Sequence, residues 1–157
     1  MAKTLLIIGT NRPESISGKY ATLLHSKLEG SEILTAFQQS TFVPKTNNLE
    51  ISGEDTKIVW FIPTYHNSMS GYSKMILDSL TDETITGLAK VEHIIISTSK
   101  TTAGATQFAD SLTSAVAFQG LTATIKSLAD TTNYTYGEVS DNYLQDIVKT
   151  VTESIKL

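Results

Sequence analysis

Cysteine is absent from this sequence of 157 residues, which excludes disulfides, thiolate metal ligands and cysteine nucleophiles. Basic residues are also few, because 12 Lys and Arg stand against 16 Asp and Glu and leave a formal net charge of −4. This balance argues against nucleic acid or an anionic membrane as a partner. A bound phosphate would therefore have to be held by local hydrogen-bond donors.

Long apolar runs are missing as well. No stretch approaches the roughly 18 residues that a membrane helix needs, and the apolar run near the N-terminus is too short for a signal peptide. We therefore expect a cytoplasmic protein with no membrane partner. Hydrophobic residues make up 40% of the chain and charged residues 18%, an ordinary globular composition. Because there is no internal repeat and no linker, we expect one domain over residues 1–157.

Short apolar runs alternate with amphipathic segments along the chain. The runs predict strands, and they cover residues 5–8, 33–37, 57–62, 91–96 and 121–125. Apolar residues at helical spacing predict helices at about 20–28, 71–80, 108–116 and 144–155. The polar stretch 38–55 has no helical stripe, so the second crossover helix should be short or absent.

Strands that alternate with helices imply right-handed crossovers and a parallel sheet covered on both faces. The pattern predicts a three-layer α/β/α, flavodoxin-like fold with a five-stranded parallel sheet in the order 2-1-3-4-5. Ligands in this architecture bind at the carboxyl ends of the strands, where the order reverses between the first and third strands. The loops after the first, third and fourth strands are therefore the candidate site.

The loop after the first strand carries donors for an anion. Its hydroxyl and guanidinium groups come from Thr10, Arg12, Ser15 and Ser17, and the amides of a helix N-terminus follow. Such a turn can hold a phosphate through backbone N–H groups and the helix dipole, with Arg12 adding a permanent positive charge. The spacing fits neither a Walker loop nor the dinucleotide GxGxxG motif. The alternative is that Ser15 or Ser17 serves only as a helix N-cap.

The loop after the third strand suits a flat heteroaromatic ring, because it offers an aromatic side chain, an amide and small residues. With both loops considered, the sequence resembles the NADPH-dependent FMN reductase family, which includes azo, quinone and chromate reductases. In the first family motif, G-S-x-R-x-x-S-x-N, this sequence has Gly9, Thr10, Arg12 and Ser15, and then Ser17 in place of Asn. The second, P-E-Y-N-G-S-x-P-G-x-x-K-x-x-x-D, is matched without a gap at Pro63, Tyr65, Ser68, Gly71, Lys74 and Asp78.

The resemblance implies a role for each matched position. Arg12, Ser15 and Ser17 would hold the FMN phosphate, with Thr10 close by. The flavin ring would be lined by Pro63, Thr64, Tyr65, His66 and Asn67. Lys74 and Asp78 would be scaffold or interface positions. In the hydroxyl-rich loop after the fourth strand, Ser99 and Gly104 would approach the flavin, although a solvated loop with a helix cap fits that segment equally well.

The sequence departs from the family where Thr64, His66, Asn67 and Ser70 replace Glu, Asn, Gly and Pro. Asn67 is a mild change if φ is positive there, because Asn tolerates that conformation best after Gly. His25 and His93 fit structural or surface positions. No residue pattern suggests a metal site or a serine hydrolase, and no catalytic side chain stands out.

The resemblance implies an FMN-dependent oxidoreductase that passes hydride from NADPH or NADH to a small electron acceptor, such as a quinone, an azo compound or a free flavin. It also implies a homodimer. Two other interpretations keep the fold. One is an FMN-binding electron carrier of the flavodoxin type, and the other is a degenerate family member that has lost the flavin and acts as a binding protein.

Overall fold

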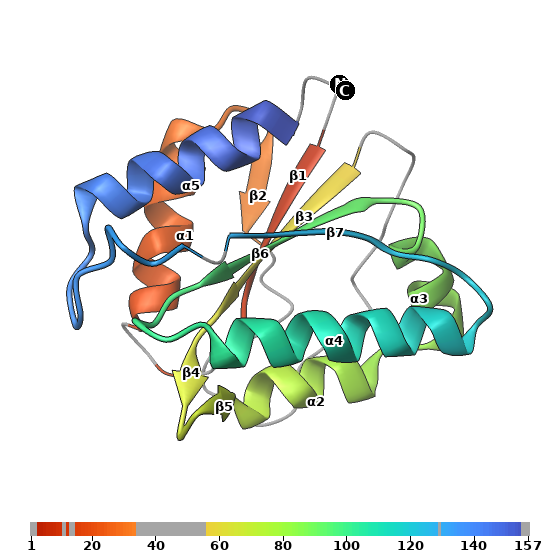
Figure 1. Ribbon diagram of the computed structural model, residues 1–157. Coiled ribbons are helices and arrows are strands. Elements are labelled where there is room, and N and C mark those ends of the chain that lie inside the picture. The colour runs from red at the N-terminus through yellow and green to blue at the C-terminus, as the bar shows by residue number, and fades with distance from the viewer. Residues whose placement is uncertain (1–2, 11, 13–14, 34–55, 129, 155–157) are drawn as a thin grey trace.

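The fold is built on a five-stranded parallel sheet in a computed structural model that describes residues 3–10, 12, 15–33, 56–128 and 130–154. The strands of this sheet are β1 (Lys3–Ile8), β2 (Ser31–Ile33), β3 (Thr56–Ile62), β6 (Glu92–Ser97) and β7 (Thr124–Leu128). They lie in the order β2-β1-β3-β6-β7, which is 2-1-3-4-5 when only these strands are counted along the chain (Figure 1). The predicted fold class and strand order are confirmed.

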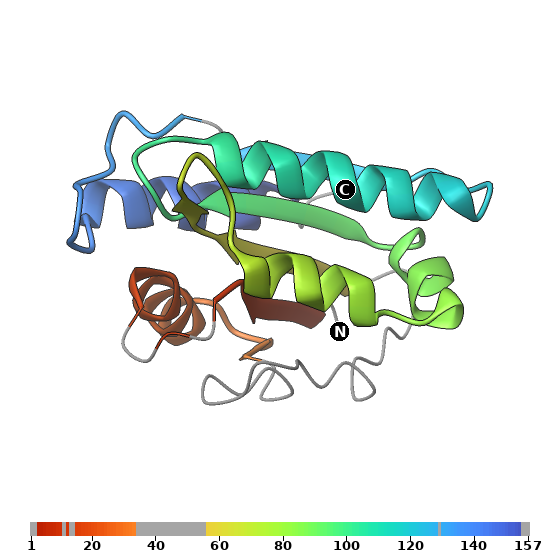
Figure 2. The ribbon, with the colours of Figure 1, turned by 90° about the horizontal axis from the view of Figure 1, so that it is seen from below.

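Helices cover both faces of the sheet. On one face lie α1 (Ile16–Lys27) and α5 (Asp141–Ser154), and on the other lie α2 (Gly71–Ser79) and α4 (Ala103–Phe118) (Figure 1). Seen from below, α2 and α4 run side by side in front of the sheet, with the short helix α3 (Asp82–Leu88) beyond the end of α2 (Figure 2). Two hydrophobic clusters, one on each face, make up the core.

The central strand β3 shows why a run of five residues, 58–62, is continuously apolar. Its residues Ile58, Trp60 and Ile62 pack into the cluster under α2 and α4, and Val59 and Phe61 pack into the cluster under α1 and α5. All five side chains are fully buried. Each is worth roughly 1.5–3 kcal/mol when removed from water, so this run, covered on both faces, favours an apolar residue at every position.

One predicted strand is displaced along the sequence, because β7 begins at Thr124 and not at residue 121. The preceding helix α4 ends in a turn in which the amide of Gly120 donates to the carbonyl of Ala117 and the amide of Leu121 donates to Val116. Gly120 has a φ of 73°, as the left-handed residue of this Schellman motif requires. Leu121 is therefore used to close the helix, and the strand starts after it.

Other differences lie outside the regular sheet. The sequence analysis did not predict α3 or the small antiparallel hairpin of β4 (Thr64–Tyr65) and β5 (Ser68–Met69). Residues 34–37 of the predicted second strand, and the polar stretch 38–55, lie outside the described residues. In the part of the chain that the structure describes, no helix combines the length and the apolar character needed to span a membrane.

Candidate functional site

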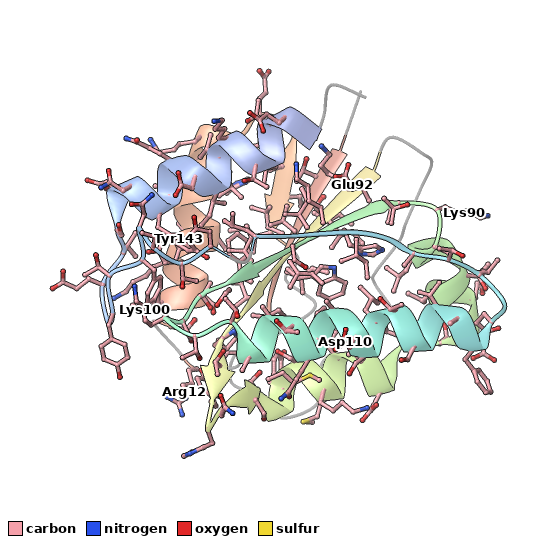
Figure 3. The ribbon with its side chains drawn as sticks, viewed as in Figure 1. Arg12, Lys90, Glu92, Lys100, Asp110 and Tyr143 are labelled. Carbon is pink, nitrogen blue, oxygen red and sulfur yellow. The ribbon has the colours of Figure 1, made fainter. Side chains whose placement is uncertain are left out.

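A pocket of about 480 Å³ opens at the carboxyl ends of β1, β3 and β6, where the strand order reverses. Its volume lies within the range of roughly 300–1,000 Å³ that is typical of small-molecule sites. It is lined by Arg12, Ser15, Ile16, Ser17, Pro63, Thr64, Tyr65, Thr98, Ser99, Tyr134, Tyr136 and Gly137. Figure 3 shows Arg12 at this edge of the molecule, beside the β4–β5 hairpin, with Lys100 on the same side.

Most of the predicted site residues meet in this pocket. They come from three loops, and they are Arg12, Ser15, Ser17, Pro63, Thr64, Tyr65 and Ser99. The remaining predicted residues are not among those that line it, and they are Thr10, His66, Asn67 and Gly104. A second hollow, of about 750 Å³, adjoins the pocket at Ser15 and runs along the side of α1 toward Leu23 and Ile33.

The N-terminus of α1 supplies the donors for an anion. Ser15 is the N-cap of this helix, because its backbone is extended and its Oγ accepts a hydrogen bond from the amide of Gly18 at 3.0 Å. Helix geometry leaves the amides of Ile16 and Ser17 without acceptors inside the helix. Both residues line the pocket, and the helix dipole adds partial positive charge there. The first loop can therefore bind an anion through its backbone, with the Ser15 hydroxyl engaged as a cap.

Ser17 joins the first loop to the loop after β6. Its side chain is 2% exposed, and its Oγ lies 2.6 Å from the Oγ1 of Thr98 in a buried hydrogen bond. Only one proton lies between two bonded hydroxyl oxygens, so the pair retains one further O–H group that can donate to a ligand. Thr98 lines the same pocket, so this donor belongs to the site.

Thr10, Arg12 and Tyr65 connect the first loop with the hairpin. The Oγ1 of Thr10 lies 3.0 Å from the phenolic oxygen of Tyr65 and accepts a hydrogen bond from the amide of Arg12 at 3.3 Å. The guanidinium of Arg12 lies over the Tyr65 ring. Thr10 is 2% exposed, so its side chain supports the loop from inside, whereas Arg12 is exposed and can reach a ligand.

The loop after β3 is the β4–β5 hairpin, and it is closed by a turn of two residues. Thr64 pairs with Met69 and Tyr65 pairs with Ser68, which leaves His66 and Asn67 at the tip with φ values of 51° and 62°. This is the conformation of a type I′ turn, in which both central residues have positive φ. The φ of Asn67 is thus positive, the condition under which the change from Gly to Asn is mild. Both tip residues are exposed, and they shape the hairpin that carries Tyr65.

Hydrogen bonds hold the hairpin against the loop after β6. The amide of Thr64 donates to the Oγ of Ser99 at 2.9 Å, and the Oγ1 of Thr64 donates to the carbonyl of Thr101 at 3.1 Å. The amide of Gly104 donates to the same Oγ1 at 3.0 Å. A Cβ on Gly104 would lie 2.4 Å from the carbonyl oxygen of Pro63, so only glycine allows α4 to begin this close to the hairpin. Gly104 is thus a packing position behind the pocket.

A fourth loop, between β7 and α5, lines the pocket and was missed in the sequence analysis. It contributes Tyr134, Tyr136 and Gly137. The phenol of Tyr134 donates to the carbonyl of Thr98 at 2.8 Å, and burial is the main cause that raises the pKa of Tyr134 to about 12. The predicted topology could have revealed this loop, because in a parallel sheet the loop after the fifth strand reaches the same edge as the loops after the first, third and fourth strands.

The wall of this loop is fixed by packed aromatic rings. Tyr134 and Tyr143 meet edge to face with ring centroids 5.5 Å apart, and Tyr20 packs edge-on against Tyr143 at the same distance. The Tyr143 hydroxyl donates to the carbonyl of Ser97 at the end of β6, and burial raises the pKa of Tyr143. The phenols of Tyr134 and Tyr143 are therefore hydrogen-bond donors at neutral pH and hold the end of β6 and the following loop in place.

The side chains around the pocket are of the kinds that bind and orient a ligand. The described residues that line it provide one cation, several hydroxyls and aromatic rings, and none of these residues is a carboxylate or a histidine. Within the described residues, no group of three His, Cys, Asp or Glu side chains could hold a metal ion. His93 lies away from the pocket, where its Nδ1 accepts a hydrogen bond from Trp60 and its Nε2 donates to Leu88. His25 is exposed, and Lys74 forms an exposed ion pair with Asp78 at 2.6 Å.

No family model matches the sequence, and no curated protein matches it. The fold matches solved structures over almost the whole chain. FerB from Paracoccus denitrificans, a flavoenzyme NAD(P)H:(acceptor) oxidoreductase, gives a TM-score of 0.61 at 12% identity, covering 99% of this chain and 95% of FerB. The apo form of EMOB, an NADH:FMN oxidoreductase, gives 0.58 at 12% identity, with 99% and 88% covered.

A third solved structure, described as a thermophilic tryptophan halogenase from Streptomycin violaceusniger, gives a TM-score of 0.53 at 15% identity, with 98% of each chain covered. At such identities a likeness shows the fold alone, and one fold can carry several functions. The chain therefore has a fold that it shares with flavin-dependent NAD(P)H oxidoreductases.

Proposed function

We propose that this protein is an FMN-dependent oxidoreductase that takes electrons from NADPH or NADH and reduces a small acceptor, such as a quinone, an azo compound or a free flavin. One observation carries the proposal. A single pocket at the switch point of the sheet combines an anion site at the N-terminus of α1 with the aromatic and polar wall of the β4–β5 hairpin. An anion site next to a wall for a flat ring is what a flavin mononucleotide requires.

The donor set fits the phosphate end of FMN. The amides of Ile16 and Ser17, the guanidinium of Arg12 and the spare proton of the Ser17–Thr98 hydroxyl pair all belong to the pocket wall. Charge-assisted hydrogen bonds of this kind are about twice as strong as neutral ones.

The rest of the wall fits a flat ring. Pro63 and Tyr65 offer apolar surface, and the polar residues Thr64, Thr98 and Ser99 line the same pocket. The hydrogen bonds of Thr64 to Ser99 and Thr101 fix the two loops relative to each other before a ligand arrives. Such preorganisation lowers the conformational entropy that binding would otherwise cost.

The lining residues have binding and orienting roles in this proposal. When bound, FMN supplies the redox chemistry, because it accepts a hydride from a nicotinamide nucleotide and passes the electrons on. The pocket supplies a charged clamp for the phosphate and a rigid wall for the ring, and it needs no general acid or base. None of the described residues that line the pocket is a carboxylate or a histidine, which agrees with these binding and orienting roles. Likeness of fold to FerB and EMOB adds support for this class of reaction.

The test is to add FMN to the purified protein, remove the free ligand and record the visible absorbance of what remains. The proposal predicts a retained flavin spectrum that NADPH or NADH bleaches under anaerobic conditions and that a quinone restores. A retained spectrum that neither nucleotide bleaches would point to an electron carrier. A colourless protein would reject the flavin site altogether. Light scattering on the same sample tests the proposed homodimer.

A further inference from the structure

The loop between β7 and α5 presents an aromatic side chain at the mouth of the pocket. Its tip is a turn over residues 135–138, in which the amide of Glu138 donates to the carbonyl of Thr135 at 3.3 Å. Gly137 has a φ of 76°, while Tyr136 is not among the residues with positive φ. A negative φ followed by a positive one defines a type II turn, which favours glycine at its third position. The turn therefore sets where Tyr136 leaves the backbone.

The base of this loop is tied to its surroundings. The hydroxyl of Ser140 donates to the carbonyl of Asn133 at 2.6 Å, and the amide of Ser140 donates to the phenolic oxygen of Tyr20 on α1 at 2.9 Å. The side-chain amide of Asn133 donates to Asp146 on α5 at 2.8 Å. The loop is thus braced between α1 and α5, and Tyr136 projects from a defined frame.

Tyr136 is unusual in its exposure. It is 85% exposed, whereas its neighbour Tyr134 on the same wall is 7% exposed. Only a few large hydrophobic side chains of the described residues are exposed, namely Leu23, Phe118, Leu121 and Tyr136. Among these, Tyr136 alone lines the pocket at the strand ends. Its ring face is open to a second ring that enters from solvent.

We infer that Tyr136 is the surface on which a planar aromatic electron acceptor of the quinone class stacks at the mouth of the pocket. The inference rests on the proposed function and names its acceptor. The buried part of the wall, at Thr98 and Tyr134, suits a tightly bound cofactor. An exposed ring suits a ligand that exchanges with solvent. Glu138 is exposed in the same turn, two residues from Tyr136, and its negative charge favours a neutral acceptor over an anionic one.

The nucleotide donor supplies the electrons that reduce the quinone at this surface. NAD(P)H and one proton reduce the quinone to the hydroquinone and leave NAD(P)⁺, so two electrons and two protons reach the acceptor. Stacking contributes to the binding of the quinone and not to the supply of electrons. Loss of the ring should therefore affect acceptors that stack and spare acceptors that do not.

The experiment compares Tyr136→Ala, Tyr136→Phe and the control Phe118→Ala, each loaded with FMN. Phe118 is another exposed aromatic, 89% exposed, at the end of α4 that lies away from the pocket. The readout is kcat/KM for 1,4-naphthoquinone divided by kcat/KM for ferricyanide, an acceptor with no ring. We expect Tyr136→Ala to lower this ratio about three- to tenfold, the size of an aromatic pair interaction. Tyr136→Phe and Phe118→Ala should keep the ratio within about twofold.

Three outcomes would overturn the inference. An unchanged ratio in Tyr136→Ala, with wild-type protein active on the quinone, would mean that the ring does not hold the acceptor. An equal fall with both acceptors, or loss of retained FMN, would assign Tyr136 to the cofactor. Wild-type protein that retains no FMN would reject the proposed function, and this inference with it, before any variant is made.

Discussion

The guanidinium carbon of Arg12 lies 4.4 Å from the centre of the Tyr65 ring, so the loop after β1 and the hairpin after β3 meet through a cation and an aromatic face. Such a contact at an exposed site is worth roughly 0.5–1 kcal/mol. A hydrogen bond from the same guanidinium to a phosphate is worth roughly 1.5–3 kcal/mol. Because the bond to phosphate is the stronger of the two interactions, Arg12 can leave the ring when an anion arrives.

The first prediction concerns Arg12 and the phosphate of FMN. Arg12→Ala should raise the Kd for FMN about 10- to 100-fold, because it removes one charge-assisted hydrogen bond. Fluorescence titration with FMN measures this change. Riboflavin, which lacks the phosphate, should bind the variant and the wild type with Kd values within about twofold of each other.

A matched variant separates this local effect from loss of charge in general. Lys90 is an exposed cation that lies far from the pocket (Figure 3). Lys90→Ala should leave the Kd for FMN within about twofold of the wild type, because charges beyond the Debye length are screened. If Arg12→Ala weakened riboflavin as much as FMN, Arg12 would act on the ring and not on the phosphate.

The second prediction concerns the glycine that begins the first loop. A Cβ on Gly9 would lie 2.6 Å from the Oγ of Ser73 and 2.9 Å from the carbonyl oxygen of Phe61. The hydroxyl of Ser73 also donates to the carbonyl of Gly9 at 2.7 Å, so the contact cannot open without losing that bond. Gly9→Ala should therefore lower the free energy of unfolding by about 1–3 kcal/mol, measured by urea denaturation.

Gly71 gives the control for this substitution. It is the first residue of α2, and a Cβ added there meets no atom within 4 Å. Gly71→Ala should leave stability unchanged or raise it by up to about 1 kcal/mol, because alanine is the better helix former. Equal destabilisation by both variants would show that the crowding around Gly9 is not the cause.

The sheet could be predicted because burial on both faces leaves a plain pattern in the sequence. In β3, Val59 and Trp60 point to opposite clusters and both are fully buried, so the run over residues 58–62 is continuously apolar. The topology then follows from the alternation of strands and helices. The position of the pocket follows in turn, because strand order decides which loops meet.

The details of the site could not be predicted in the same way. The Ser17–Thr98 hydrogen bond joins residues 81 positions apart. The sequence around either residue does not distinguish its hydroxyl from one that faces solvent. The same holds for Tyr134, whose hydrogen bond to the Thr98 carbonyl depends on how α5 packs beside α1. Local patterns predict elements, whereas these contacts arise from the packing of elements onto one another.

The third prediction concerns the turn at the tip of the hairpin. Asn67 has a φ of 62°, a conformation that costs a β-branched residue roughly 1–2 kcal/mol. Asn67→Val should lower the free energy of unfolding by about that amount in urea denaturation, whereas Asn67→Gly should preserve or raise it. Asn142→Val, at an exposed position of α5, is the control and should change stability by about 0.5 kcal/mol or less.

The fourth prediction concerns stability against pH and rests on His93. This side chain is fully buried, and its two ring nitrogens bond to Trp60 at 3.0 Å and Leu88 at 2.7 Å. Burial is the main cause that lowers its pKa below 6.5, with smaller opposing effects from the Leu88 carbonyl and the charge of Glu92. The bond from Trp60 also requires an unprotonated Nδ1. Both observations mean that His93 is neutral in the folded protein.

The neutral state of His93 determines how the stability of the protein changes with pH. As the pH falls below about 6.5, the unfolded chain binds a proton that the folded protein does not. The contribution of His93 to stability is therefore complete above that pH and is lost below it, by up to about 1.4 kcal/mol per pH unit, until the folded pKa is reached. Urea denaturation at several pH values between about 7 and 5 measures the slope.

Variants assign this slope to His93. In His93→Gln the amide can still accept from Trp60 and donate to Leu88, but it does not titrate, so the slope should flatten by the His93 contribution. His25→Gln, which replaces an exposed histidine, should keep the wild-type slope. If His93→Gln does not fold, NMR titration of the wild-type imidazole gives the answer directly. A His93 pKa at or above about 6.5 in the folded protein would contradict the prediction.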